Sequence, residues 1–142
     1  KLLMLGGVAI DSQFAFDADS DGDVILHAIA NALSSSLGGG SLGTFATAMC
    51  EDGITDSRVY VQSVLKKMKK KDSRLFIAHL AVSIEGSHPA IDPHAPAMRA
   101  ALAKLLEMPG ERIGNTATSG KNNSAYGKGQ ALKVTVFLQL RY

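Results

Sequence analysis

Residues 20–28 read SDGDVILHA, and this stretch decides the fold of the chain. Its first half is rich in Ser, Asp and Gly, which is typical of a tight turn. Apolar residues then recur at helical spacing as far as Leu33, and Gly38 is a natural stop signal. An Asp of the cluster can cap the first turn. We therefore predict a turn followed by a helix that begins near Val24.

The same stretch holds two groups that could carry chemistry. Asp23 and His27 stand four residues apart, so one helical turn can bring both side chains to the same side. A neutral imidazole is a good zinc ligand and a carboxylate can join it, but a catalytic zinc usually takes three protein ligands. The pattern by itself therefore leaves two interpretations of His27, a metal ligand or a buried histidine that hydrogen-bonds to backbone.

Further elements follow on both sides of this helix. The sequence predicts four strands, at residues 2–10, 75–84, 112–118 and 131–140, and two more helices, one from residue 55 and one introduced by Pro93 and Pro96. The order predicts one α/β (α+β) domain over residues 1–142, in which helices cover one face of a mixed sheet.

The final predicted strand carries information about assembly. Its apolar residues alternate with Lys133, Thr135, Phe137 and Gln139. This second face is too mixed for free solvent. We therefore expect the sheets of several copies to pack against one another.

Composition excludes several classes of function. The net charge of +2 is too small to indicate a nucleic-acid partner, and the lysine-rich run at residues 66–71 reads as a solvated helix end. Cys50 is the only cysteine and cannot form an internal disulfide, which suits a reducing compartment. No apolar run is long enough for a membrane span. We expect a soluble protein of a bacterial cytoplasm or of an organelle such as a plastid or mitochondrion.

Five segments together resemble one known family. They are SDGDVILHA at residues 20–28, DSR at 56–58, PHAPAMR at 93–99, ATS at 117–119 and GKG at 127–129. In this order and spacing they look like the SDGDV-x-LHA, DSR, PHxPxMR, ATTTE and GRG segments of the 2-C-methyl-D-erythritol 2,4-cyclodiphosphate synthases. The resemblance covers essentially the whole chain.

The resemblance implies a specific activity and assembly. Such enzymes are homotrimers with active sites between subunits. They act as phosphorus–oxygen lyases that convert a cytidine-diphosphate-linked methylerythritol 2-phosphate into a cyclic diphosphate and CMP, with zinc and a second ion, magnesium or manganese. Membership of a larger assembly stays open.

The resemblance also assigns roles to individual residues. His27 matches a zinc ligand. Asp23, Lys121 and Lys128 are the catalytic candidates, with Asp23 as an orienting group or pocket acid and the two lysines as phosphate-neutralising cations. Asp21, Thr118 and Ser119 are the candidates for substrate binding, the last two near the cytidylate.

Several family positions are changed here. The family's Asp-x-His zinc ligands have no counterpart, as if the chain started too late. The other replacements are Asp19 for a His, Asn31 and Ser41 for Asp residues, Ala90 for a Lys and Lys121 for the magnesium-binding Glu. Unit charges 4 Å apart interact by about 4 kcal/mol at an effective dielectric of 20, so a lysine opposes a metal ion at that position.

The changes lead us to expect an inactive or impaired homologue that serves as a structural or ligand-binding subunit, with metals possible only if the family site is intact. Two alternatives stay open. One is an active synthase with zinc and magnesium or manganese, and the other is a module that binds a cytidine nucleotide or an isoprenoid without turnover.

Overall fold

A computed structural model describes residues 2–12, 18, 20–119 and 131–142 of the chain. The elements follow one another as β1 (Leu2–Leu5), β2 (Val8–Asp11), α1 (Val24–Ser36), α2 (Gly43–Glu51), α3 (Ser57–Lys71), β3 (Phe76–Glu85), α4 (Ala95–Leu106), β4 (Ile113–Thr118) and β5 (Lys133–Arg141). Short 3₁₀ turns at Asp92–His94 and Gly110–Arg112 precede α4 and β4.

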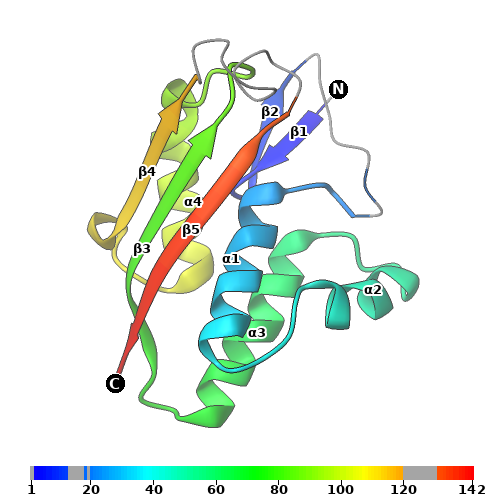
Figure 1. The fold of residues 1–142 in the computed structure, drawn as a ribbon, viewed down its shortest axis with the longest axis vertical. Coiled ribbons are helices and arrows are strands. Elements are labelled where there is room, and N and C mark those ends of the chain that lie inside the picture. Colours follow the sequence, from blue (N-terminus) through cyan, green and yellow to red (C-terminus); the bar gives the residue numbers. More distant parts are fainter. Residues whose placement is uncertain (1, 13–17, 19, 120–130) are drawn as a thin grey trace.

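The main sheet has three strands in the order β4-β3-β5 (Figure 1). Leu80 at the centre of β3 pairs with Ile113 of the parallel strand β4 and with Leu138 of the antiparallel strand β5. Parallel neighbours need a crossover connection, and α4 supplies it between β3 and β4. The predicted mixed sheet is therefore confirmed.

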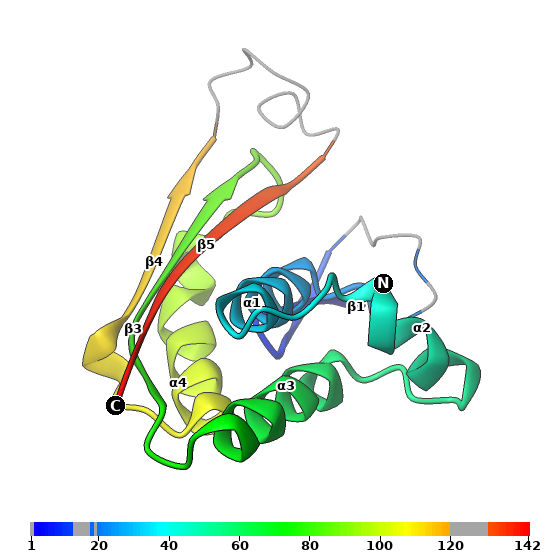
Figure 2. The ribbon, with the colours of Figure 1, turned by 60° about the horizontal axis from the view of Figure 1, so that its bottom comes forward.

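The described helices lie on one side of this sheet (Figure 2). α1 and α4 lie next to the sheet, and α3 packs against α1 on the side away from the sheet. The core between these layers is aliphatic. Its fully buried members include Leu26, Ile29, Leu33, Val61, Val64, Leu80, Met98 and Leu102. The sequence prediction of helices covering one face of the sheet is confirmed.

The alternation predicted for the last strand is also observed. Val134 and Leu138 are half-buried against the helices, whereas Thr135 and Phe137 point to the opposite face. The side chain of Phe137 is 73% exposed. A large aromatic group therefore lies on the face that no described helix covers.

The first predicted strand is wrong in one respect, because residues 2–10 form a hairpin rather than one bent strand. β1 and β2 pair antiparallel, with Leu5 opposite Val8. The two residues between them, Gly6 and Gly7, both have positive φ angles, 61° and 80°. Two-residue hairpin turns need this left-handed backbone, which glycine adopts without steric cost.

Helix α2 was not predicted from the sequence. This helix contains three Thr or Cys residues and buries only Ala46, so neither its helix propensity nor its apolar pattern is strong. A side chain from α1 holds its beginning, because Asn31 Oδ1 accepts a hydrogen bond from Leu42 N at 2.6 Å. Asn31 thus has a local structural role.

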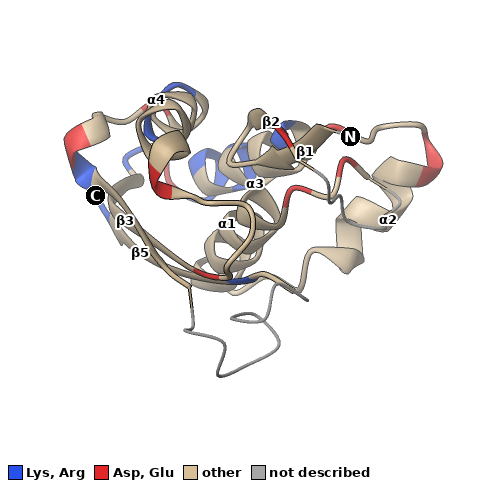
Figure 3. Cartoon of the chain, turned by 90° about the horizontal axis from the view of Figure 1, so that it is seen from above, with Lys and Arg blue, Asp and Glu red and all other residues tan. Residues whose placement is uncertain are grey.

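α3 begins and ends as its sequence predicts. Asp56 caps its first turn by accepting from Arg58 N at 3.0 Å. Its last turn carries Lys69, Lys70 and Lys71, which complement the negative end of the helix dipole. In Figure 3, where Lys and Arg are blue, parts of this helix are blue for that reason. Within the part of the chain that the structure describes, we find no helix with the length and hydropathy of a membrane span.

Candidate functional site

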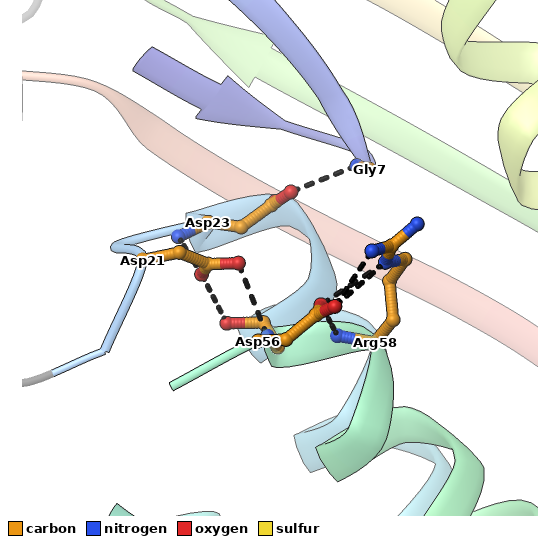
Figure 4. Close-up of polar contacts among 6 residues, drawn as sticks. Gly7, Asp21, Asp23, Asp56 and Arg58 are labelled. Carbon is orange, nitrogen blue, oxygen red and sulfur yellow. Dashed lines mark hydrogen bonds and ion pairs between the residues drawn. The ribbon is translucent and has the colours of Figure 1, made fainter. Parts of the chain in front are cut away.

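Asp23 joins the turn of the hairpin to the start of α1. Its Oδ1 accepts from Leu26 N at 3.0 Å, which caps the helix, and from Gly6 N at 2.9 Å. Its Oδ2 accepts from Gly7 N at 2.8 Å, a contact shown in Figure 4. The side chain is fully buried. Burial raises the pKa of Asp23, and the three backbone hydrogen bonds act in the opposite direction.

Asp21 joins the same turn to the start of α3. Its Oδ1 accepts from Asp23 N at 3.1 Å and from the hydroxyl of Ser57. Its Oδ2 accepts from Ser57 N at 3.1 Å. Because Ser57 is the first residue of α3, this carboxylate holds the N-terminal ends of α1 and α3 together.

Ser57 also contacts the imidazole of His27. The distance from Ser57 Oγ to His27 Nε2 is 2.8 Å, and Ser20 Oγ lies 3.3 Å from the same nitrogen. His27 is half-buried, and burial lowers its pKa, whereas the negative charges of Asp21 and Asp23 act to raise it. The imidazole is therefore favoured in its neutral form, which is the form that can offer a lone pair.

His27 lines a cavity of about 470 Å³. The other walls come from the loop before α1, from α2 and from α3, and consist of Ala18, Ser20, Leu42, Gly43, Ala46, Thr47, Cys50, Glu51 and Tyr60. This volume lies within the range of small-molecule sites in proteins. The missed helix α2 therefore forms most of one wall of the candidate site.

Tyr60 supports the floor of this cavity from α3. Its ring centroid lies 6.1 Å from that of His27, and its hydroxyl donates to the carbonyl of Ile54 at 2.6 Å. That bond uses the hydroxyl proton, so the 2.7 Å contact with Cys50 Sγ has the thiol as donor. Burial, followed by the hydrogen bond with Cys50, raises the pKa of Tyr60.

The sequence model that describes the YgbB family matches residues 1–141 of this chain. The chain belongs to the YgbB family. Its relatives include the 2-C-methyl-D-erythritol 2,4-cyclodiphosphate synthase of Chlamydia trachomatis serovar L2b, with 39% identity over 147 residues, 100% of this chain and 81% of the relative. The protein of the same name from Chlamydia caviae is 40% identical over 134 residues, 94% of this chain and 74% of the relative.

Solved structures show the same fold. A 2C-methyl-D-erythritol-2,4-cyclodiphosphate synthase superposes with a TM-score of 0.88 and 25% identity over 99% of this chain and 90% of the other. The bifunctional IspDF of Campylobacter jejuni gives a TM-score of 0.89 at 22% identity, covering 100% of this chain and 38% of that one. The family model and the curated relatives confirm the family resemblance seen in the sequence, and the solved structures confirm the fold.

The fold of this YgbB-family chain brings only some of the predicted site residues together. Asp21, Asp23 and His27 lie at one place, at the start of α1. Thr118 ends β4 and Ser119 follows it; both are exposed, and neither lines the cavity beside His27. The predictions for Lys121 and Lys128 concern positions outside the described residues.

The described residues do not form a complete metal site. Within residues 2–12, 18, 20–119 and 131–142, no three His, Cys, Asp or Glu side chains are placed to hold an ion. His27 could contribute one ligand, but Asp23 is occupied by three backbone amides. The Asp23–His27 pair expected from helical spacing thus supplies one candidate ligand rather than two.

Four residues at the site were not singled out by the sequence. Ser57 lay within the DSR segment without an assigned role, and Ser20 within the SDGD segment. Tyr60 lies in none of the motifs, and Cys50 was considered only as a cysteine that cannot form an internal disulfide. One signal could have identified Ser57, because the DSR segment belongs to the same ordered set of motifs as the SDGD turn.

Proposed function

We propose that this protein carries out the cyclodiphosphate synthase reaction. The observation that carries the proposal is the placement of His27, whose ring is held by Ser57 at the wall of a 470 Å³ cavity. The family membership supports it, since relatives with 39–40% identity bear that enzyme's name. The substrate would be the cytidine-diphosphate-linked methylerythritol 2-phosphate, and the route is non-mevalonate isoprenoid biosynthesis.

The reaction forms one phosphorus–oxygen bond and breaks another. An oxygen of the 2-phosphate attacks the β-phosphorus of the diphosphate, and the bridging oxygen leaves with its electron pair as part of CMP. Such a transfer depends on positioning and charge neutralisation more than on a strong base. Ser20 lines the cavity and would contact the phosphorylated end of the substrate there, beside His27.

The cytidylate end needs residues from elsewhere. Thr118 and Ser119, the predicted nucleotide contacts, do not line the cavity of their own chain. We propose that they serve the site of a neighbouring copy in a homotrimer, and that Lys121 and Lys128 neutralise phosphate charge. The exposed Phe137 supports such an assembly, because its sheet face offers a large apolar group for burial between copies.

Zinc, and magnesium or manganese, stay predictions from the resemblance. His27 is the proposed zinc ligand, while the hydrogen bonds of Asp23 favour a structural role for that carboxylate. Asp21, first considered as a substrate contact, is likewise engaged with Ser57 and Asp23 N.

The second candidate function is an impaired homologue, retained as a structural or ligand-binding subunit. The sequence observation that favours it is Lys121 at the position of the family's metal-binding Glu. A cytidine nucleotide would then bind without turnover, and would raise the thermal stability of the native protein by mass action.

CMP release separates the two candidates. The full-length protein is incubated with the diphosphocytidyl methylerythritol 2-phosphate substrate, Zn²⁺ and Mg²⁺, and CMP is quantified by chromatography. We expect release that is lost in His27→Ala and retained in His88→Ala, a matched histidine change in an exposed loop. No release from a folded, trimeric protein would refute the synthase proposal, and stabilisation by CMP alone would then support the impaired homologue.

A further inference from the structure

The hydroxyl of Ser57 lies between two side chains that compete for its single proton. On one side is Asp21 Oδ1, and on the other is His27 Nε2 at 2.8 Å. A serine hydroxyl has one proton to donate and can also accept. The proton of Ser57 can therefore point to Asp21 or to His27, and the two choices place opposite demands on the imidazole.

Asp21 decides the direction. An ionised carboxylate can only accept hydrogen bonds, so Oδ1 has no favourable contact with Ser57 Oγ unless the hydroxyl proton points to it. Asp21 also accepts from Asp23 N and Ser57 N, which fixes the carboxylate in place. Ser57, with its proton committed to Asp21, can only accept from His27.

The consequence for His27 is a single tautomer. Its Nε2 must carry the proton that Ser57 Oγ accepts at 2.8 Å. The longer contact with Ser20 Oγ, at 3.3 Å, also fits an oxygen that accepts from this N–H. In a neutral imidazole the lone pair then resides on Nδ1.

We infer that Asp21 and Ser57 are positioning residues that hold His27 in its Nε2–H tautomer. This tautomer leaves the lone pair on Nδ1, which is then the ring nitrogen that can bind a ligand. A group that accepts or donates at the second ring nitrogen is how proteins set the tautomer and orientation of a functional histidine. The importance of this arrangement for turnover rests on the proposed synthase function, but the arrangement itself does not.

The test is the tautomer of His27, read from its side-chain ¹⁵N shifts in the full-length protein at a pH above the ordinary imidazole value of about 6.5. His27→Asn identifies the signals among those of the four histidines. We expect Nε2–H in the native protein. A native Nδ1–H tautomer would overturn the inference.

Ser57→Ala removes the acceptor and should lower the ratio of Nε2–H to Nδ1–H by roughly twofold to tenfold, the range expected for one hydrogen bond. The matched control is Ser36→Ala, which removes a hydroxyl that donates to Ala32 O at 2.8 Å on the exposed side of α1, and should leave the ratio unchanged. An unchanged ratio in folded Ser57→Ala would show that Ser57 does not position the ring.

Ser57 is fully buried, so its alanine variant could fail to fold. Asp21→Asn then carries the test, because an amide replaces one of the two acceptor oxygens with a donor and weakens the hold on the Ser57 proton. The ratio should fall in this variant also, and no change would refute the role of Asp21. Because the readout needs no substrate, a failure here is distinct from an absence of CMP release.

Discussion

Replacing Asp23 by alanine should destabilise the protein through two elements at once. The change removes the cap of α1, worth about 1 kcal/mol, and leaves the amides of Gly6 and Gly7 without their acceptor. A buried amide without a partner costs about 1–3 kcal/mol, and the Gly7 amide lies closer to solvent and so toward the lower end.

Part of this loss is recovered. Burial raises the pKa of Asp23, so the native state bears a desolvation cost for the ionised carboxylate that alanine does not carry. The expected net decrease in the free energy of unfolding is about 3 kcal/mol, a large part of the usual 5–15 kcal/mol. For a chain of this size it corresponds to a decrease in Tm of roughly 10 °C.

Urea denaturation followed by circular dichroism measures the change, with Asp56→Ala as the matched control. Asp56 is also a helix N-cap, but it accepts from a single backbone amide and is partly exposed. Its replacement should cost about 1 kcal/mol. If Asp23→Ala were no more destabilising than Asp56→Ala, the bonds to the hairpin would contribute nothing and the reasoning would be refuted.

Four other changes have definite expected outcomes. The hydrogen bond from Arg58 lowers the pKa of Asp56 in the folded protein below its ordinary value of 3.8. The native protein should therefore be more stable than Asp56→Asn above pH 3.8, and this advantage should disappear as the pH falls through the lower pKa of the folded state. Chemical denaturation at several pH values tests whether the advantage grows with pH. Tyr60→Phe deletes a hydroxyl bonded to a backbone carbonyl and should cost about 1–2 kcal/mol in urea denaturation. Gly7→Ala has room for its methyl group but keeps a φ of 80°, so a loss of about 1–2 kcal/mol is expected, and an unchanged midpoint would argue against a left-handed turn. Phe137→Lys should convert the proposed trimer to smaller species in light scattering, and a persistent trimer would place the interface elsewhere.

The secondary structure was predictable where its signal is local. The alternation of β5 has a period of two, and the start of α3 carries its own cap in Asp56. The turn at Gly6 and Gly7 was missed because a glycine pair can soften a strand or reverse it, and the partners that accompany the reversal, the pairing of β1 with β2 and the carboxylate of Asp23, are set by the tertiary structure. α2 was missed because it buries little and lacks a side-chain cap of its own.

The candidate site was predictable in part. His27 was singled out through helical spacing and the SDGD segment, and the structure places it at the wall of a cavity. The same spacing paired Asp23 with His27 as possible ligands, but the structure directs that carboxylate to the hairpin. The side chain that contacts the His27 ring is that of Ser57. No spacing rule could pair this serine with a residue thirty positions earlier.

The sequence by itself determined the family, the fold class and the places where helices α1 and α3 begin, because turn residues, caps and apolar periods act over a few neighbouring residues. Only the tertiary structure decided the use of each polar group. A carboxylate such as Asp21 or Asp23 accepts from whichever amide or hydroxyl the packed core brings within hydrogen-bond distance, and those donors come from the start of a distant helix and from a hairpin turn. Hydrogen bonds are short-ranged and directional, so the partner is set by the packing of whole elements and not by the local pattern that forms them.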